Sequence, residues 1–184
     1  VSKDGKLLTA NHVVSKALDF SVVDAKGAVH EAKVVAIDAY NDLAVLQLTN
    51  PASFKAFKPM RLAENLPAKL EESQLFALGH PDMVNDVVMS VAPRNGASTA
   101  LQAGDTIFST VLARPGNSGG PLINMAGEVV GVNRTVMSVM GEKPVLWSTT
   151  SVAARRLLAG ITEVKPATEN VFADGNVSKW LIPD

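Results

Sequence analysis

The chain contains no cysteine among its 184 residues. Disulfide bonds, thiolate metal sites and a cysteine nucleophile are therefore excluded, and the redox compartment is left open. Nor does it contain an apolar run near the roughly 20 residues that a membrane-spanning helix needs. Like charges do not form blocks, because 17 basic and 18 acidic residues are interspersed and leave a formal net charge of -1. We therefore expect neither nucleic acid nor an anionic membrane as a partner.

Hydrophobic residues make up 47% of the sequence, enough for one large domain or two small ones. They occur in short β-branched runs divided by turn residues, which is typical of strands. Connections such as Asp4-Gly5 and Lys26-Gly27 are too short for helical crossovers, so the sheets should be antiparallel. The expected strands cover residues 6–9, 20–23, 29–37, 43–48, 74–78, 87–92, 106–112, 121–124, 129–135 and 144–149.

The stretch 50–69 loses this alternation and carries three prolines, which predicts an extended connection between two barrels. The sequence thus predicts an N-terminal barrel over residues 1–66 and a C-terminal barrel over 67–150. A C-terminal helix and tail should occupy 151–184. Within it, Ser151 is the expected helix cap and Gly160 the expected stop.

One serine stands among three glycines in the stretch 114–122, which reads Arg-Pro-Gly-Asn-Ser-Gly-Gly-Pro-Leu. Glycine lets the backbone approach a ligand closely, so two N–H groups can point at one oxygen. We interpret Ser118 as a nucleophile; an ordinary surface turn is the alternative. The G-x-S-x-G elbow of α/β-hydrolases also matches, but there the histidine follows the serine. Here His12, His30 and His80 all precede it, which excludes the elbow.

A serine hydroxyl needs an imidazole to accept its proton and a carboxylate to orient that imidazole. His12 is the first choice of base, because it lies at the end of a predicted strand between apolar neighbours. Asp42 is the first choice of acid, because it directly precedes the apolar strand 43–48. Asp38 is the second choice, and an ordinary turn at Asn41-Asp42 is the competing interpretation.

In three blocks the chain resembles chymotrypsin-fold (trypsin-like) serine proteases, specifically those of the HtrA/Deg group. The blocks occur in the order of that family: Thr-Ala-Asn-His-Val-Val at 9–14, Asn-Asp-Leu-Ala-Val-Leu at 41–46 and Gly-Asn-Ser-Gly-Gly-Pro-Leu at 116–122. The segments 1–5, 77–81 and 127–133 extend the match over about residues 1–150.

The resemblance implies an all-β, chymotrypsin-like double barrel: two antiparallel six-stranded β-barrels followed by a C-terminal helix. It implies His12 as general base, Asp42 as its orienting acid and Ser118 as nucleophile of an acyl transfer that water completes. The N–H groups of Gly116 and Ser118 would form the oxyanion hole, with Asn117 between them. Because the amide of Asn117 cannot pair with a new N-terminal ammonium, we expect control by a rearranging loop instead of N-terminal cleavage.

The resemblance also places the substrate pocket, with its floor at Leu112 and Ala113 and one wall at Val132, Asn133 and Arg134. No acidic residue occurs between positions 109 and 118, which disfavours a Lys or Arg side chain in the pocket. We expect a small or medium apolar side chain there. Arg134 replaces the small polar residue expected by resemblance, and would favour an acidic side chain if it pointed inward.

Unfolded or extended polypeptides are the partners that the resemblance implies, with no cofactor and no metal. A homotrimer and an extracytoplasmic location, periplasmic or secreted, are further expectations from the family. The chain begins at Val1 and not at Met, so we expect that it has been trimmed. The competing hypothesis is a catalytically silent or partner-activated peptide-binding module on the same fold.

Overall fold

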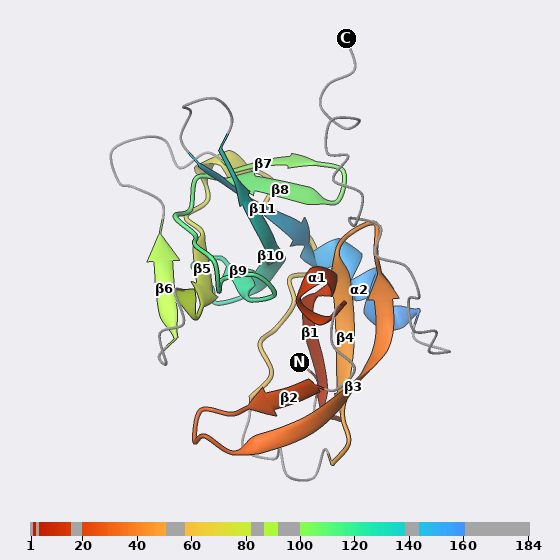
Figure 1. Cartoon of the computed structure of the whole chain (residues 1–184). Helices are drawn as coiled ribbons and strands as arrows, with labels where there is room; N and C mark the ends of the chain where they lie inside the picture. The colour runs from red at the N-terminus through yellow and green to blue at the C-terminus, as the bar shows by residue number, and fades with distance from the viewer. Residues whose placement is uncertain are drawn as a thin grey trace.

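Two curled sheets make up the fold, and the strands within each pair antiparallel (Figure 1). The computed structural model describes residues 2, 4–15, 20–50, 58–81, 87–91, 100–138 and 144–160. The first sheet has the order β1-β4-β3-β2, from β1 (Lys6–Ala10), β2 (Phe20–Val23), β3 (Val29–Asp38) and β4 (Leu43–Leu48). The second has the order β6-β5-β9-β10-β11-β8-β7. Its strands are β5 (Phe76–Gly79), β6 (Val88–Val91), β7 (Ala100–Ala103), β8 (Thr106–Ser109), β9 (Pro121–Ile123), β10 (Val129–Met137) and β11 (Val145–Thr150).

The predicted all-β double barrel with a C-terminal helix is confirmed, although the described residues form four and seven strands instead of six in each barrel. β7 is the strand that the sequence did not indicate, because Ala100-Leu101-Gln102-Ala103 contains no β-branched residue. It pairs with β8, which ends at Ser109, three residues before the predicted end. The tail 161–184 and the connection 139–143 between two of the expected strands lie outside the described residues.

The first sheet curls around a core of aliphatic side chains from alternate positions. Phe20 and Val22 of β2 pack against buried Ala44, Leu46 and Leu48 of β4 and neighbouring side chains. The register between β3 and β4 shifts between Val34 and Ala36, which marks a bulge that increases the local bend.

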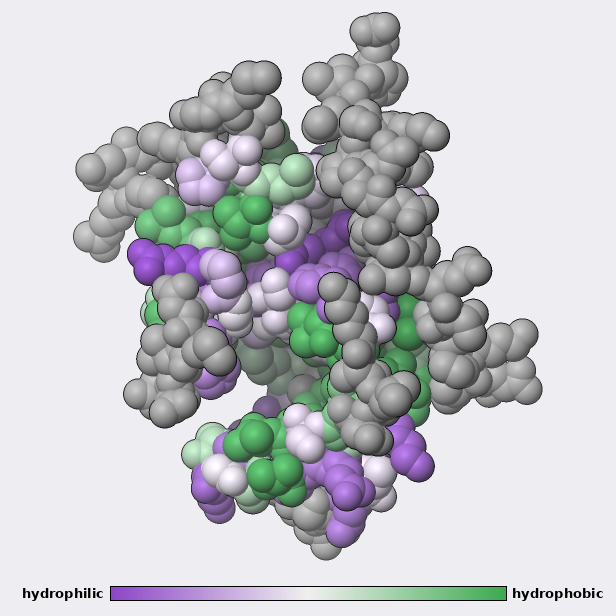
Figure 2. All heavy atoms as spheres, in the orientation of Figure 1, coloured by the Kyte–Doolittle hydropathy of each residue, from purple (hydrophilic) through white to green (hydrophobic). Residues whose placement is uncertain are grey.

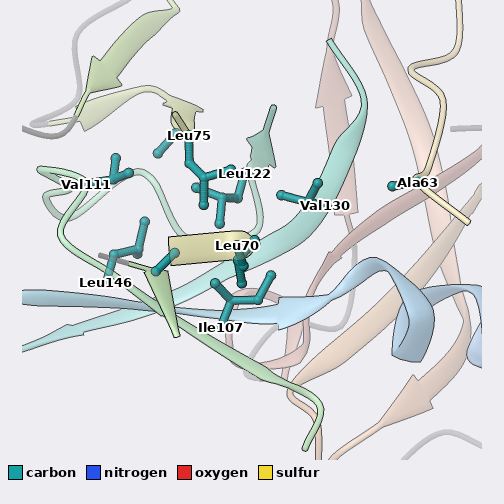
Figure 3. Packing of buried hydrophobic residues seen from close by; sticks show 10 residues of the cluster. Ala63, Leu70, Leu75, Ile107, Val111, Leu122, Val130 and Leu146 are labelled. Carbon is teal, nitrogen blue, oxygen red and sulfur yellow. The ribbon is translucent and has the colours of Figure 1, made fainter. Parts of the chain in front are cut away.

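The second sheet has the larger core, in which side chains from several strands converge (Figure 3). Leu75, Ile107, Leu122, Val130 and Leu146 are almost fully buried in it. Each aliphatic side chain buried in this way stabilises the fold by about 1.5–3 kcal/mol relative to leaving it exposed. The core therefore fixes β9 and β10, the two strands that border the serine loop.

The described part of the predicted linker, residues 58–69, packs against the second sheet. Leu62 forms an isolated parallel bridge with Val129, and the N–H of Ala63 donates to the Val129 carbonyl at 2.9 Å. Ala63 is itself buried in the second core (Figure 3). This segment is consequently a packed part of the second unit. The domain boundaries at 66 and 150 stay predictions.

Helix α2 (Ser151–Ala159) lies where the two sheets meet (Figure 1). Ala153 and Ala154 pack in one cluster with Leu43 of β4 and Val132 of β10. The helix has the predicted bounds, but its cap is Thr150 and not Ser151. The hydroxyl of Thr150 accepts from the Ala153 N–H at 3.2 Å, because the cap residue lies one position before the first helical residue. α2 thus joins the sheets that carry the candidate histidine and serine.

The molecular surface drawn in Figure 2 is mixed, with apolar residues in several separate places among hydrophilic ones. Val87, Met89, Val91 and Leu112 are exposed, and the Leu112 N–H donates to the Val91 carbonyl at 3.4 Å. Of the helices in the described ranges, none is long and apolar enough to cross a membrane.

Candidate active site

His12 lies in α1 (Asn11–Val14), a helix of four residues that begins directly after β1. The sequence had placed it at a strand end; the strand stops at Ala10 because the chain turns into this helix. The Asn11 N–H donates to the Asp42 carbonyl at 3.1 Å, which fastens the start of α1 to the turn between β3 and β4. α1 therefore presents His12 near the junction of the sheets (Figure 1).

Asp42 holds His12 through both oxygens of its carboxylate. Oδ1 accepts from the backbone N–H of His12 at 2.8 Å, and Oδ2 lies 2.7 Å from Nδ1 of the ring. Because an ionised carboxylate only accepts hydrogen bonds, the proton of neutral His12 is on Nδ1. Nε2 is then left with a lone pair, which is what a general base requires. The side chain of Asp42 is only 6% exposed, whereas that of His12 is 41% exposed.

The turn that carries Asp42 is itself well supported. Asp42 has a φ of 53°, an uncommon value for a non-glycine residue, and Asp38 stabilises the turn by accepting two hydrogen bonds from Asn41. The Thr149 hydroxyl donates to the Asn41 carbonyl at 2.5 Å, so β11 holds this turn from the second sheet. Asp38, the second choice of acid, therefore serves the turn and does not contact His12.

The loop before Ser118 begins with a tight turn. The Asn117 N–H donates to the Arg114 carbonyl at 3.0 Å, with Pro115 and then Gly116 as the central residues. Gly116 has a φ of 101°, and proline followed by a positive-φ glycine is characteristic of a type II turn. Within the described residues, the N–H groups of Gly116 and Ser118 donate to no protein acceptor. Two donors two residues apart are thus available to one oxygen atom.

Three glycines of this loop, Gly116, Gly119 and Gly120, lie where a Cβ would overlap a neighbouring atom. A Cβ on Gly116 would come within 2.0 Å of the His80 carbonyl oxygen, and one on Gly119 within 2.2 Å of the Thr9 hydroxyl. The first contact locks the turn against residues 80–81, and the His80 N–H also donates to the Gly116 carbonyl at 3.1 Å. The second places the Ser118 loop against β1, two to three residues before His12.

The hydroxyl of Ser118 donates to the carbonyl oxygen of Arg134 at 2.8 Å. The Arg134 side chain lies beneath the same site, with Nε 3.8 Å from Oδ2 of Asp42. Arg134 is therefore next to both Ser118 and Asp42. The sequence predicted Arg134 only as a residue of the pocket wall. The sign of a further role was that a long cationic side chain stands where the resemblance leads us to expect a small polar one.

A cavity of about 270 Å³ opens beside Ser118. Of the five predicted pocket residues, Ala113, Asn133 and Arg134 line it. Leu112 does not line it and is 53% exposed, while Val132 is 2% exposed because its side chain packs under α2. The sequence analysis did not assign the other lining residues to the pocket; they are Arg114, Pro115, Asn117, Ser118, Thr135, Val136 and Leu146. Of the described residues that line the cavity, none is acidic.

Two buried asparagines support the loop and the cavity wall. The amide of Asn133 accepts from the Ser148 hydroxyl at 3.1 Å, and its backbone pairs with Gly119 and Gly120. The side chain of Asn117 is buried, and neither its oxygen nor its nitrogen meets a partner in the described part of the chain. A buried unpaired amide costs about 1–3 kcal/mol, so this conformation of the loop carries an internal cost.

The remaining histidines make other contacts. Nε2 of His30 lies 3.0 Å from a carboxylate oxygen of Asp24, and both side chains are largely buried. Chiefly the hydrogen bond from His30, and then those from the Ala28 and Lys26 N–H groups, lower the pKa of Asp24. His80 supports the Gly116 turn. Across the described ranges, no three His, Cys, Asp or Glu side chains form a group that could hold a metal ion.

The fold and this arrangement identify the class of protein. The chain belongs to the trypsin-like peptidase family, whose model, the trypsin-like peptidase domain, matches residues 1–132. Within that family its relatives are proteases of the HtrA/Deg type, as the sequence blocks predicted.

Three comparisons illustrate this similarity. A probable periplasmic serine endoprotease DegP-like from Rhizobium meliloti (strain 1021) is 29% identical over 184 residues, covering 98% of this chain and 34% of that protein. Its counterpart from Ectopseudomonas mendocina (strain ymp) is 34% identical over 145 residues, covering 77% and 29%. The solved structure of the HtrA-type protease AlgW with decapeptide has 28% identity and a TM-score of 0.69, covering 88% of this chain and 49% of that one. The chain therefore spans about a third of the length of these curated relatives.

Proposed function

We propose that this protein is a serine endopeptidase that cleaves unfolded or extended polypeptides through a Ser-His-Asp triad and an acyl-enzyme. The bidentate contact of Asp42 with His12 carries the proposal, because it leaves Nε2 of the ring as a proton acceptor. Membership of the trypsin-like peptidase family supports it. His12 is the proposed general base, Asp42 the residue that orients it, and Ser118 the nucleophile.

In the proposed reaction, Oγ of Ser118 attacks the carbonyl carbon of the scissile peptide while its proton passes to Nε2 of His12. The N–H groups of Gly116 and Ser118, on either side of Asn117, stabilise the negative charge that develops on the carbonyl oxygen. His12 then gives its proton to the leaving amine, and water hydrolyses the ester by the same route. Before the attack, the Ser118 hydroxyl must rotate from the Arg134 carbonyl to Nε2 of His12.

For the substrate, we propose an extended strand that lies beside β10, with a small or medium apolar side chain in the cavity next to Ser118. Val136, Leu146 and Ala113 supply apolar walls. A lysine or arginine side chain is disfavoured, because the part of the lining that the structure describes offers no acidic residue to pair with it. A peptide library in which cleavage after Lys or Arg dominates would contradict this part of the proposal.

A homotrimer, which rests on the resemblance of the sequence blocks, and an extracytoplasmic location, which the names of the relatives support, complete the proposal. Two of them are named as periplasmic, and the Protease Do-like 1 of Arabidopsis thaliana as chloroplastic. Cell fractionation and light scattering of the full-length protein are the direct measurements. A cytoplasmic monomer would contradict both statements.

Labelling with a fluorophosphonate tests the catalytic proposal, since this reagent reacts only where the serine, its base and the oxyanion donors are in register. We expect labelling of the wild type between about pH 6 and pH 9, and none of the Ser118→Ala protein. A folded wild type that stays unlabelled throughout would contradict the proposal. It would favour the second candidate, a silent or partner-activated peptide-binding module. The hydrogen bond from the Ser118 hydroxyl to the Arg134 carbonyl supports this candidate, because it turns the hydroxyl to an acceptor other than His12.

A further inference from the structure

Arg134 of β10 turns its side chain toward Asp42, the residue proposed to orient His12. Its Nε lies 3.8 Å from Oδ2 of Asp42, and the same oxygen lies 2.7 Å from Nδ1 of His12. The side chains of Arg134 and Asp42 are 16% and 6% exposed, so solvent screens this pair less than it would a surface pair. A guanidinium therefore stands beside the carboxylate that faces the imidazole.

The separation decides how Arg134 acts. At 3.8 Å it is too long for a hydrogen bond, so Arg134 does not take an acceptor position away from His12. Its effect on the carboxylate is electrostatic, and it extends to the imidazole on the other side of that carboxylate. Arg134 is thus a fixed positive charge beside the carboxylate that faces His12.

Several other charged side chains on the elements around α1 have partners of their own. α1 packs against β1, β3 and β4, and β4 carries no charged residue. The charged or titratable residues of β1 and β3 are Lys6, His30, Glu31, Lys33 and Asp38; Arg114 lies in the Ser118 loop, and His80 in the segment that contacts this loop. Lys6 pairs with Asp4, His30 with Asp24 and Asp38 with Asn41. Arg134, in contrast, forms an ion pair with Asp42 of the His12–Asp42 couple.

We infer that Arg134 is a positioning residue that holds the Asp42 carboxylate and extends toward acid the pH range in which His12 works as a base. This inference rests on the proposed function. His12 must be neutral to accept the Ser118 proton, and the nearby guanidinium disfavours its premature protonation by solvent. The same charge makes His12 a weaker base, so the wider pH range on the acid side comes with a lower rate at neutral pH.

The test measures the second-order rate constant of fluorophosphonate labelling from about pH 5 to about pH 9. In Arg134→Met, which keeps an apolar stem without the charge, the pH of half-maximal rate should rise by about 0.5 to 1 unit. Arg134→Gln should behave in the same way, which covers the case that one of the two fails to fold. Arg134→Lys, which keeps the charge, should leave the midpoint close to that of the wild type. Arg155→Met removes an exposed arginine of α2 and is the matched control for net charge.

A wild-type midpoint in Arg134→Met and Arg134→Gln would overturn the inference, even if the maximal rate changed. An equal shift in Arg134→Lys or in Arg155→Met would overturn it too, since charge beside Asp42 would not be the cause. Absence of labelling in the folded wild type would instead contradict the proposed function itself. The two failures are therefore distinguishable.

Discussion

The hydroxyl of Ser118 points at the carbonyl oxygen of Arg134 and not toward a nitrogen of His12. That carbonyl belongs to β10, the strand beside which we place the extended substrate. A backbone N–H of the substrate would compete with the hydroxyl for this acceptor, because both are donors of similar strength. Substrate binding would then release Ser118 toward His12, which makes the observed arrangement a resting state of the proposed site.

Replacement of Asp42 by asparagine should reduce the rate of hydrolysis by about 10⁴-fold without unfolding the protein. The asparagine oxygen can still accept from the His12 N–H, but its NH₂ group would face Nδ1 and favour the wrong tautomer. The rate of fluorophosphonate labelling is the measurement. Asp38→Asn is the matched control: it weakens the turn by about 1 kcal/mol and should leave labelling within a few-fold of wild type. Equal losses in both variants would contradict the distinct role of Asp42.

The Gly116→Ala substitution should displace the oxyanion donors and so lower the rate of fluorophosphonate labelling, while the protein still folds. Its Cβ would lie 2.0 Å from the His80 carbonyl oxygen at a φ of 101°, so the turn must move. We expect a fall of at least about 10²-fold in labelling rate, the effect of losing one oxyanion donor. Gly127→Ala has a φ of 73° but open space around its Cβ, so it should cost about 1 kcal/mol in unfolding and leave labelling intact.

At the start of α2, Thr150 and Ser151 should respond in opposite ways to loss of the hydroxyl. Thr150→Val keeps the volume but removes the cap of the Ala153 N–H, so the free energy of unfolding should fall by about 1–2 kcal/mol. The Ser151 hydroxyl is buried and meets no partner in the described ranges, so Ser151→Ala should be neutral or slightly stabilising. Urea denaturation measures both. A larger loss in Ser151→Ala than in Thr150→Val would contradict the observed cap.

The Asp24–His30 pair should make the free energy of unfolding depend on pH in the acid range. The lowered pKa of Asp24 means that the folded state favours its carboxylate, so this contribution to stability is present above the ordinary aspartate pKa of about 3.8 and is lost as the pH falls below it. Asp24→Asn keeps an oxygen for the Lys26 and Ala28 N–H groups but removes the charge. Its deficit in unfolding free energy should therefore be largest near neutral pH and shrink through the acid range. A deficit that grows as the pH falls would contradict this assignment.

The sequence predicted the two-barrel fold because its strands are separated by short turns and carry β-branched residues in regular runs. Local propensity did not reveal β7, whose residues favour a strand only through pairing with β8. Nor did it reveal α1, since four residues form a helix there through tertiary contacts such as that from Asn11 to Asp42. The cap of α2 was predicted one residue too late, at Ser151 instead of Thr150, because sequence patterns do not locate helix ends to a single residue.

The candidate residues His12 and Asp42 could be paired from their motifs, and the structure brings them together. The contact between Arg134 and Asp42 could not be predicted from the sequence. A residue on a β-strand can direct a long side chain past its neighbours to a partner on another sheet. Val132 was expected in the pocket, but strand alternation turns it to the opposite face from Asn133 and into the cluster under α2. The pocket assignment from sequence therefore followed the strand without resolving its two faces.

The hydrogen bond from Thr149 to the Asn41 carbonyl joins residues 108 positions apart. A nascent chain that emerges from the ribosome forms the first sheet long before Thr149 is synthesised, since domains generally fold from the N-terminus during synthesis. The turn bearing Asp42 gains its outer anchor only when β11 arrives. Translation products that stop before Thr149 would consequently carry the histidine, the aspartate and the serine but lack the hydrogen bond that holds the Asp42 turn against the second sheet. The proposed proteolytic activity would therefore begin only after synthesis has passed this point.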